Sequence, residues 1–180
     1  MNNKTIQASI IIIGNEILSG RTKDTNTSTL AIWLNSIGVK VSEVRVIPDI
    51  EETIINTVNS LKKKYDYVFT SGGIGPTHDD ITAESIASCF DVPLKIREDA
   101  VELLAKNYQN GKKDLNEARL RMARIPKGAK LIENKISGAP GFIIKNVFVM
   151  AGVPKIFEAM VQEIILGLGS KNPILSKTLK

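Results

Sequence analysis

The sequence predicts an α/β fold, a three-layer α/β/α sandwich around a mostly parallel sheet. Three observations lead to this fold: strand and helix signals alternate along the first half of the chain, the strand-like segments are short and apolar, and small or acidic residues follow them. Right-handed crossovers between parallel strands place helices on both faces of a sheet. A chain of 180 residues that is 43% hydrophobic can bury one continuous core.

The first half of the chain contains the clearest elements. Residues 6–13 form a nearly continuous β-branched run, as a strand buried on both faces does. Further strands are expected at residues 39–47 and 67–70. Helical spacing of apolar residues predicts three intervening or following helices, at residues 27–37, 49–63 and 82–90. Asn26 is predicted to cap the first helix, and Asp49 with Glu52 forms a capping-box pattern before the second.

The second half is less regular. Two helices are expected at residues 97–108 and 114–124, followed by short strands at 130–133, 142–144 and 147–150, the last two as a hairpin across Lys145 and Asn146. A final amphipathic helix is expected at residues 154–166, with Pro154 in its first turn. The single domain is thus expected to span residues 6–166, and residues 167–180 to be a basic tail or the start of a further region.

Composition limits the classes of partner. The single cysteine, Cys89, has no second cysteine with which to form a disulfide, which suits a reducing cytoplasm, and no signal-peptide pattern begins the chain. The longest apolar run is too short to cross a membrane. The formal charge is +5, but the lysines are scattered and aromatic residues make up only 5%. We therefore expect a cytoplasmic protein with neither a membrane nor a nucleic acid as partner.

The residues that follow the parallel strands are small, acidic or typical of tight turns. They are Gly14-Asn15-Glu16, Pro48-Asp49, Ser71-Gly72-Gly73-Ile74-Gly75 and Ala151-Gly152-Val153-Pro154. In an open α/β sheet these strand ends share one edge, where ligands bind. Glycines allow a ligand to approach the backbone, and amides that lead into a helix favour an anion such as phosphate. The functional site is therefore expected at this edge.

Asp49 and Asp80 would repel a phosphate unless a cation lies between them. Magnesium is usually held by one or two carboxylates together with substrate phosphates and waters, so Mg²⁺ or another divalent cation is the expected cofactor. The alternative is that both aspartates only cap helices. His78 is either a proton carrier or a bystander in an exposed loop. The chain has no G-x-x-x-x-G-K-[ST] motif, which excludes P-loop chemistry.

An ordered set of motifs resembles the MoaB/Mog molybdopterin-binding domain family, most closely its CinA N-terminal branch. The motifs are GNEILSG at 14–20, DTN at 24–26, Pro48-Asp49, SGGIGPTHDDIT at 71–82, Asn134 with GAPGF at 138–142, and Gly152-Val153-Pro154. The resemblance implies the family's α/β sandwich, with a nucleotide or a pterin phosphate bound across the same edge. It also implies a homo-oligomer.

The resemblance also assigns roles to residues. Asp49 and Asp80 match the family's two functional aspartates, implying that they are catalytic and hold the metal. Val153 stands where Mog-type proteins usually carry serine or asparagine, so a side-chain hydrogen bond to the pterin or its phosphate is lost. The implied ligand-binding residues are Gly14, Asn15, Glu16, Asn26, Ser71, Gly72, Gly73, Gly75, Thr77, Asp79, Gly138, Pro140, Gly141, Gly152, Val153 and Pro154.

Three functions follow as hypotheses. The first is Mg²⁺-dependent hydrolysis of a pyrophosphate such as that of ADP-ribose, as implied by CinA-type relatives. The second is adenylyl transfer to molybdopterin during molybdenum cofactor biosynthesis, as implied by Mog-type relatives. The third is a ligand-binding module without turnover.

Overall fold

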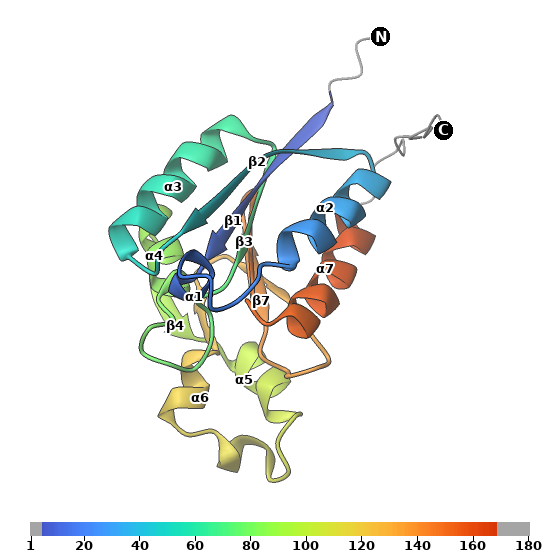
Figure 1. Ribbon diagram of the computed structural model, residues 1–180. Coiled ribbons are helices and arrows are strands. Elements are labelled where there is room, and N and C mark those ends of the chain that lie inside the picture. The colour runs from blue at the N-terminus through green and yellow to red at the C-terminus, as the bar shows by residue number, and fades with distance from the viewer. Residues whose placement is uncertain (1–4, 169–180) are drawn as a thin grey trace.

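The computed structural model describes residues 5–168 and has the predicted three layers (Figure 1). Its central sheet has six strands in the order β2-β1-β3-β8-β7-β6. The first four strands pair in parallel, β7 pairs antiparallel to β8, and β6 pairs antiparallel to β7. The strands, in sheet order, are β2 (Val39–Ile47), β1 (Ile6–Ile13), β3 (Tyr67–Ser71), β8 (Val147–Met150), β7 (Gly141–Ile144) and β6 (Lys130–Ile132). The predicted fold class is therefore confirmed.

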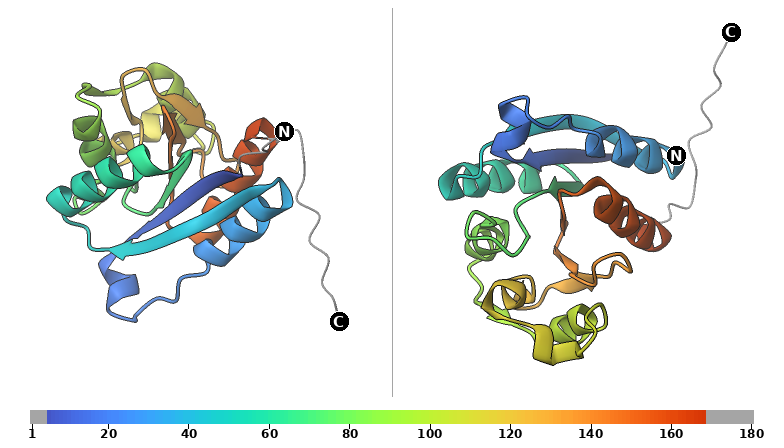
Figure 2. Two further views of the ribbon diagram at one scale, coloured as in Figure 1. Left: turned by 90° about the horizontal axis from the view of Figure 1, so that it is seen from above. Right: turned by 60° about the horizontal axis from the view of Figure 1, so that its bottom comes forward.

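Helices cover both faces of the sheet (Figures 1 and 2). One buried cluster joins α2 and α7 to one face of the sheet, and a second joins α3 and α4 to the other. The helices are α1 (Asn15–Leu18), α2 (Asn26–Ser36), α3 (Glu51–Lys64), α4 (Thr82–Cys89), α5 (Glu98–Ala105), α6 (Glu117–Arg121) and α7 (Pro154–Leu168). The final helix extends two residues into the predicted tail, and residues 169–180 lie outside the described residues.

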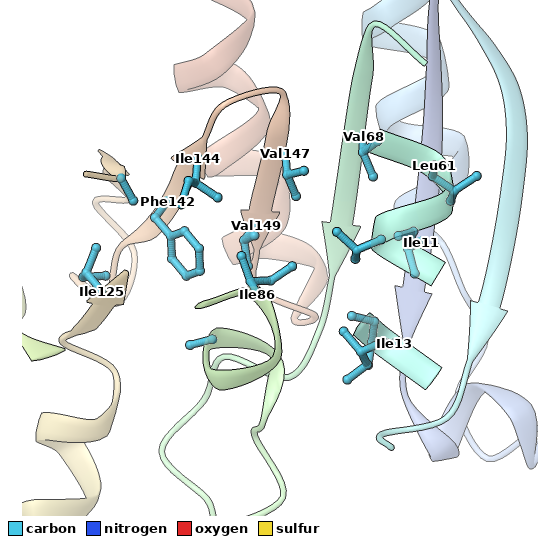
Figure 3. Close-up of a cluster of buried hydrophobic side chains, with 14 of the residues drawn as sticks. Ile11, Ile13, Leu61, Val68, Ile86, Ile125, Phe142, Ile144, Val147 and Val149 are labelled. Carbon is cyan, nitrogen blue, oxygen red and sulfur yellow. The ribbon is translucent and has the colours of Figure 1, made fainter. Parts of the chain in front are cut away.

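The core explains why β1 is apolar at nearly every position. Ile10 and Ile12 belong to the cluster with α2 and α7, whereas Ile11 and Ile13 belong to the cluster with α3 and α4. Alternate side chains of a strand point to opposite faces, so a strand covered on both sides needs no polar positions. In Figure 3 Ile11 and Ile13 lie in the second cluster, which extends to Ile125 beyond β7.

A small lobe fills the long connection between β3 and β8. It contains α5, α6, a 3₁₀ turn (Gly111–Asp114) and an antiparallel ribbon of β4 (Leu94–Ile96) and β5 (Arg124–Pro126). The helix predicted over residues 114–124 is present but shorter, because Leu115 is extended and the Asn116 side chain accepts from the Arg119 amide, so α6 begins only at Glu117. The ribbon was not predicted, since strands of three residues are too short to show alternation.

Two predicted helix caps were wrong. Asn26 is the first residue of α2, and the Asp24 carboxylate accepts hydrogen bonds from the amides of Asn26 and Thr27 instead. Ile50 occupies the N-cap position of α3, and no side chain caps that helix. The Asp49 side chain is therefore used elsewhere, as described below.

Within residues 5–168, every helix is too short or too polar to cross a bilayer.

Candidate active site

A cavity of about 440 Å³ opens at the carboxyl ends of β3 and β8. Its lining comes from Glu16 and Thr22 after β1, from the loop after β3, from Met122 of the small lobe, from Ser137 and Ala139 before β7, and from residues 151–154 and 156. Segments that are far apart in the chain thus meet at one edge, as the strand exits predicted.

Glycines let the chain turn sharply between β3 and the cavity. Gly72 has φ of +110° and Gly73 has φ of +70°, conformations that L side chains rarely adopt. A Cβ atom on Gly72 would lie 2.1 Å from the Ile13 carbonyl oxygen, and one on Gly73 would lie 2.1 Å from Thr82 Oγ1. The Gly72 amide donates to the Met150 carbonyl oxygen at 3.0 Å, so it already has an acceptor within the protein. The Gly72 amide is therefore not available to an anion in the cavity.

Asn26 ties three segments together beneath the cavity. Its buried side-chain amide donates to Ser71 Oγ and to the Gly152 carbonyl oxygen, both at 2.8 Å. Asn26 and Ser71 do not line the main cavity, but they line an adjoining recess of about 50 Å³. Both residues thus hold the segments that line the cavity in place.

We expect Asn26→Ala to lower the free energy of unfolding by about 1–3 kcal/mol, because it removes two hydrogen bonds and leaves the Gly152 carbonyl without this donor. Chemical denaturation measures the change. Asn35→Ala, at an exposed position of the same helix, is the matched control and should change little. Equal effects of both substitutions would show that the Asn26 bonds contribute nothing.

Asp49 and Asp80 lie close enough to interact through their charges. Burial raises the pKa of the Asp49 carboxyl, and the negative charges of Glu16 and Asp80 add to this rise, whereas a hydrogen bond from the Asn15 amide opposes it. Asp49 Oδ2 accepts from that amide at 2.9 Å. Asp80 Oδ2 accepts from the amide of Thr77 at 2.9 Å and from Thr77 Oγ1 at 2.6 Å. Asp80 and Glu16 line the cavity, whereas Asp49 does not.

Neither aspartate caps a helix. Ile50 and Ile81 occupy the N-cap positions of α3 and α4, and neither helix has a side-chain cap. The capping interpretation of Asp49 and Asp80 is therefore wrong, and their carboxylates are free to serve a ligand or a metal through the oxygens that these hydrogen bonds do not occupy.

The residues present fit a cation that is shared with a ligand. Residues 5–168 contain no group of three or more His, Cys, Asp or Glu side chains arranged to hold a metal. Burial is the main cause of the raised pKa of Asp49, and the negative charges of Glu16 and Asp80 add a smaller part, which a cation would offset. Magnesium accepts one or two carboxylates and completes its shell with water and phosphate oxygens. Asp49 and Asp80 match that requirement.

Asp49→Asn should make the protein more stable at neutral pH. A carboxyl whose pKa is raised by folding contributes stability below its unfolded pKa and loses it as the pH rises through the folded pKa. The asparagine oxygen can still accept from the Asn15 amide. The gain over wild type should shrink as the pH falls through the raised folded pKa and should be absent below about 3.9, where both side chains are neutral. Denaturation midpoints across pH test this, and a destabilised variant at neutral pH would contradict it.

Several predicted ligand residues lie away from the cavity lining. The Asp79 side chain is 77% exposed and pairs with His78 Nε2 at 3.0 Å. Gly141 belongs to β7, and a Cβ on Gly138 would meet Asn107 and the Leu103 backbone of α5, so both glycines serve packing. Pro140 lines a smaller recess behind the cavity. The predicted residues that line the cavity itself are Glu16, Gly72, Gly73, Gly75, Asp80, Gly152, Val153 and Pro154.

Sequence reasoning missed several lining residues, namely Thr22, Ile74, Pro76, Met122, Ser137, Ala139, Ala151 and Ile156. Ile74, Pro76 and Ala151 lie within motifs already singled out, so closer attention to those motifs would have found them. Met122 carries no signal, because only the packing of the small lobe brings it to the cavity.

A comparison with protein families decides the relationship. Residues 9–176 match the family described as probable molybdopterin binding domain. The chain belongs to this family. Among its relatives, a protein of Archaeoglobus fulgidus is 39% identical over 156 residues, which cover 87% of this chain and 66% of the relative. One from Thermoplasma acidophilum is 40% identical over 159 residues, covering 86% and 61%. This molybdopterin-binding domain thus spans less than two thirds of those relatives.

Solved structures agree with the family. The protein CinA of Thermoplasma acidophilum, described as having unknown function, is 37% identical, with a TM-score of 0.83 over 90% of this chain and 97% of that one. The tungsten cofactor synthesizing protein MoaB of Pyrococcus furiosus is 20% identical, with a TM-score of 0.58 over 93% and 99%, and shows the shared fold alone. The molybdopterin-binding domain is therefore CinA-like, as the motifs indicated.

Proposed function

We propose that this molybdopterin-binding domain binds a nucleotide at the carboxyl edge of its sheet and hydrolyses a pyrophosphate such as that of ADP-ribose with the help of a divalent cation. One observation carries the proposal: Asp49 and Asp80 interact electrostatically beside a cavity of about 440 Å³, and neither caps a helix. Paired carboxylates next to a ligand-sized cavity suit a metal-assisted reaction.

The protein's own groups prepare the site in two ways. The Asn15 amide orients the Asp49 carboxylate, and Thr77 orients that of Asp80, so that both would hold the cation without rearrangement. Apolar side chains of Ile74, Met122 and Ile156 would cover a base or a ring and exclude water. When bound, the cation would neutralise phosphate charge and lower the pKa of an attacking water.

The shape of the site favours a ligand with two parts. The recess of about 50 Å³ joins the main cavity through four shared lining residues: Glu16, Thr22, Gly152 and Pro154. Asn26 and Lys23 also line that recess and offer polar groups, whereas the main cavity is flanked by apolar side chains. A dinucleotide-like molecule has a pyrophosphate between two end groups, so one end can lie against the apolar side chains and the other can reach the recess, while the pyrophosphate lies in the main cavity near Asp80.

The second candidate is adenylyl transfer to molybdopterin. It is favoured by the fold shared with MoaB and by the same metal-binding pair. The apolar Val153 on the cavity lining argues against it, since this side chain offers no hydrogen bond to a pterin or its phosphate. Pyrophosphate hydrolysis is therefore placed first.

Incubation with ADP-ribose, with FAD, and with ATP plus molybdopterin, each with and without Mg²⁺, separates the candidates. Release of AMP from ADP-ribose only when the metal is present supports the proposed function. Adenylylated molybdopterin supports the second candidate. Binding without any product identifies a ligand-binding module and contradicts both enzymatic functions.

A further inference from the structure

Two arginines of the small lobe share one carboxylate of α4, and they share it unequally. Arg124 Nη2 lies 2.5 Å from Glu84 Oε1, a close ion pair. Arg121 Nη2 lies 3.6 Å from the same oxygen, which is beyond hydrogen-bonding distance. Glu84 is therefore neutralised mainly by Arg124, and Arg121 interacts with it more weakly.

Arg121 also has a hydrogen-bond donor with nothing to bind. Its Nε atom is buried and has no hydrogen-bond acceptor among residues 5–168. Glu84 Oε2 is also buried and has no hydrogen-bond partner among these residues. Buried donors of this kind are uncommon in native proteins, and each requires an explanation such as a bound water or a ligand. An arginine can present Nε and an Nη group together to two oxygens of a phosphate.

The position of Arg121 connects it with the active-site cavity. Both arginines line a water-sized recess of about 10 Å³, and this recess shares Ile74, Gly75, Asp80 and Met122 with the lining of the main cavity. Arg121 also precedes Met122 in the chain, so it is joined directly to a residue of the cavity lining. The charged residues on the described lining of the main cavity are Glu16 and Asp80, which are both acidic. An anionic ligand there lacks a cationic side chain.

We propose that Arg121 supplies that cation and binds a phosphate group of a ligand in the cavity. To do so the guanidinium turns away from Glu84 and passes Met122. Arg124 stays on Glu84 Oε1, so the carboxylate keeps its close ion pair when Arg121 moves, and the cost of an unpaired charge is avoided. Arg121 thereby becomes the residue that distinguishes phosphorylated ligands from unphosphorylated ones. This inference rests on the proposed binding of nucleotides.

Calorimetric titration of adenosine, AMP and ADP-ribose at constant Mg²⁺ tests the assignment. Arg121→Gln should weaken binding of AMP and ADP-ribose roughly 10- to 100-fold, as expected for loss of a charged hydrogen bond, and leave adenosine unchanged. Arg121→Lys keeps the charge and should retain most of the preference for AMP. Glu84→Gln releases Arg121 and should strengthen AMP binding severalfold without affecting adenosine.

Arg119→Gln is the matched control, since Arg119 lies in the same helix but stacks on Tyr108 and donates to the Asp114 carbonyl oxygen. It should leave the preference for AMP over adenosine unchanged. Equal weakening of AMP and adenosine by Arg121→Gln would show a packing role and overturn the assignment. An unchanged AMP affinity would also overturn it and identify a purely structural contact. If wild type binds none of the three probes, the proposed function fails as well.

Discussion

Asp80→Asn is expected to reduce metal-dependent hydrolysis of ADP-ribose roughly 100- to 1,000-fold, the range seen when a key electrostatic group is removed from an active site. The substitution removes one of two carboxylates that would hold the cation, but its amide oxygen can still accept from the Thr77 amide. Stability should therefore change by only about 1 kcal/mol. Initial rates with saturating Mg²⁺, together with a thermal melt, measure the two effects.

Asp79→Asn is the matched control for this experiment. Asp79 is the adjacent residue, carries the same charge, and is exposed outside the cavity lining. Its replacement should leave the rate within about twofold, because screened surface charges contribute little. Full activity of Asp80→Asn would remove the assignment of the metal pair. Equal losses in both variants would indicate that the loop's net charge matters, rather than the position of Asp80.

Gly72→Ala is expected to destabilise the fold by about 2–5 kcal/mol, because it combines backbone strain with a steric clash. The added Cβ would lie 2.1 Å from the Ile13 carbonyl oxygen, and backbone of a buried strand cannot move aside as a flexible side chain does. Shifting the chain would also break the hydrogen bond from the Gly72 amide to Met150. Urea denaturation of the purified variant measures the loss.

Gly20→Ala separates the two causes. Gly20 has φ of +74°, but a Cβ atom there meets nothing within 4 Å. It should cost about 1–2 kcal/mol, from backbone strain alone. If Gly72→Ala costs no more than Gly20→Ala, the close approach of β1 to the loop after β3 has no energetic consequence.

The first half of the fold could be predicted because its signals are local. β1 was predicted over its full observed length from a continuous β-branched run, and α2 and α3 were predicted to within about two residues at each end. The ribbon of β4 and β5 could not be predicted, since its strands have three residues each and pair across a separation of about thirty positions. Pairing at that distance depends on tertiary packing, in which Ile125 reaches the same buried cluster as Phe142.

The site residues likewise fall into those that the sequence predicts and those that depend on tertiary packing. Glu16, Asp80 and the glycines after β3 follow parallel strands, so the topology of the sheet alone predicts where they meet. Met122 reaches the cavity, and the arginine pair the recess beside it, only because the small lobe packs against α4. The side chain of Asn26 was assigned to a helix cap because the spacing of residues does not show that Ser71 and Gly152 lie beneath it.

The long connection between β3 and β8 has a consequence for how such proteins diverge. These two strands are neighbours in the sheet, yet residues 72–146 separate them in the chain and form part of the cavity wall. Evolution can therefore exchange or resize the small lobe within this connection, residues 94–126, while the six strands of the sheet and the aspartate pair stay in place. Homologues that act on different small molecules should accordingly vary most within this lobe.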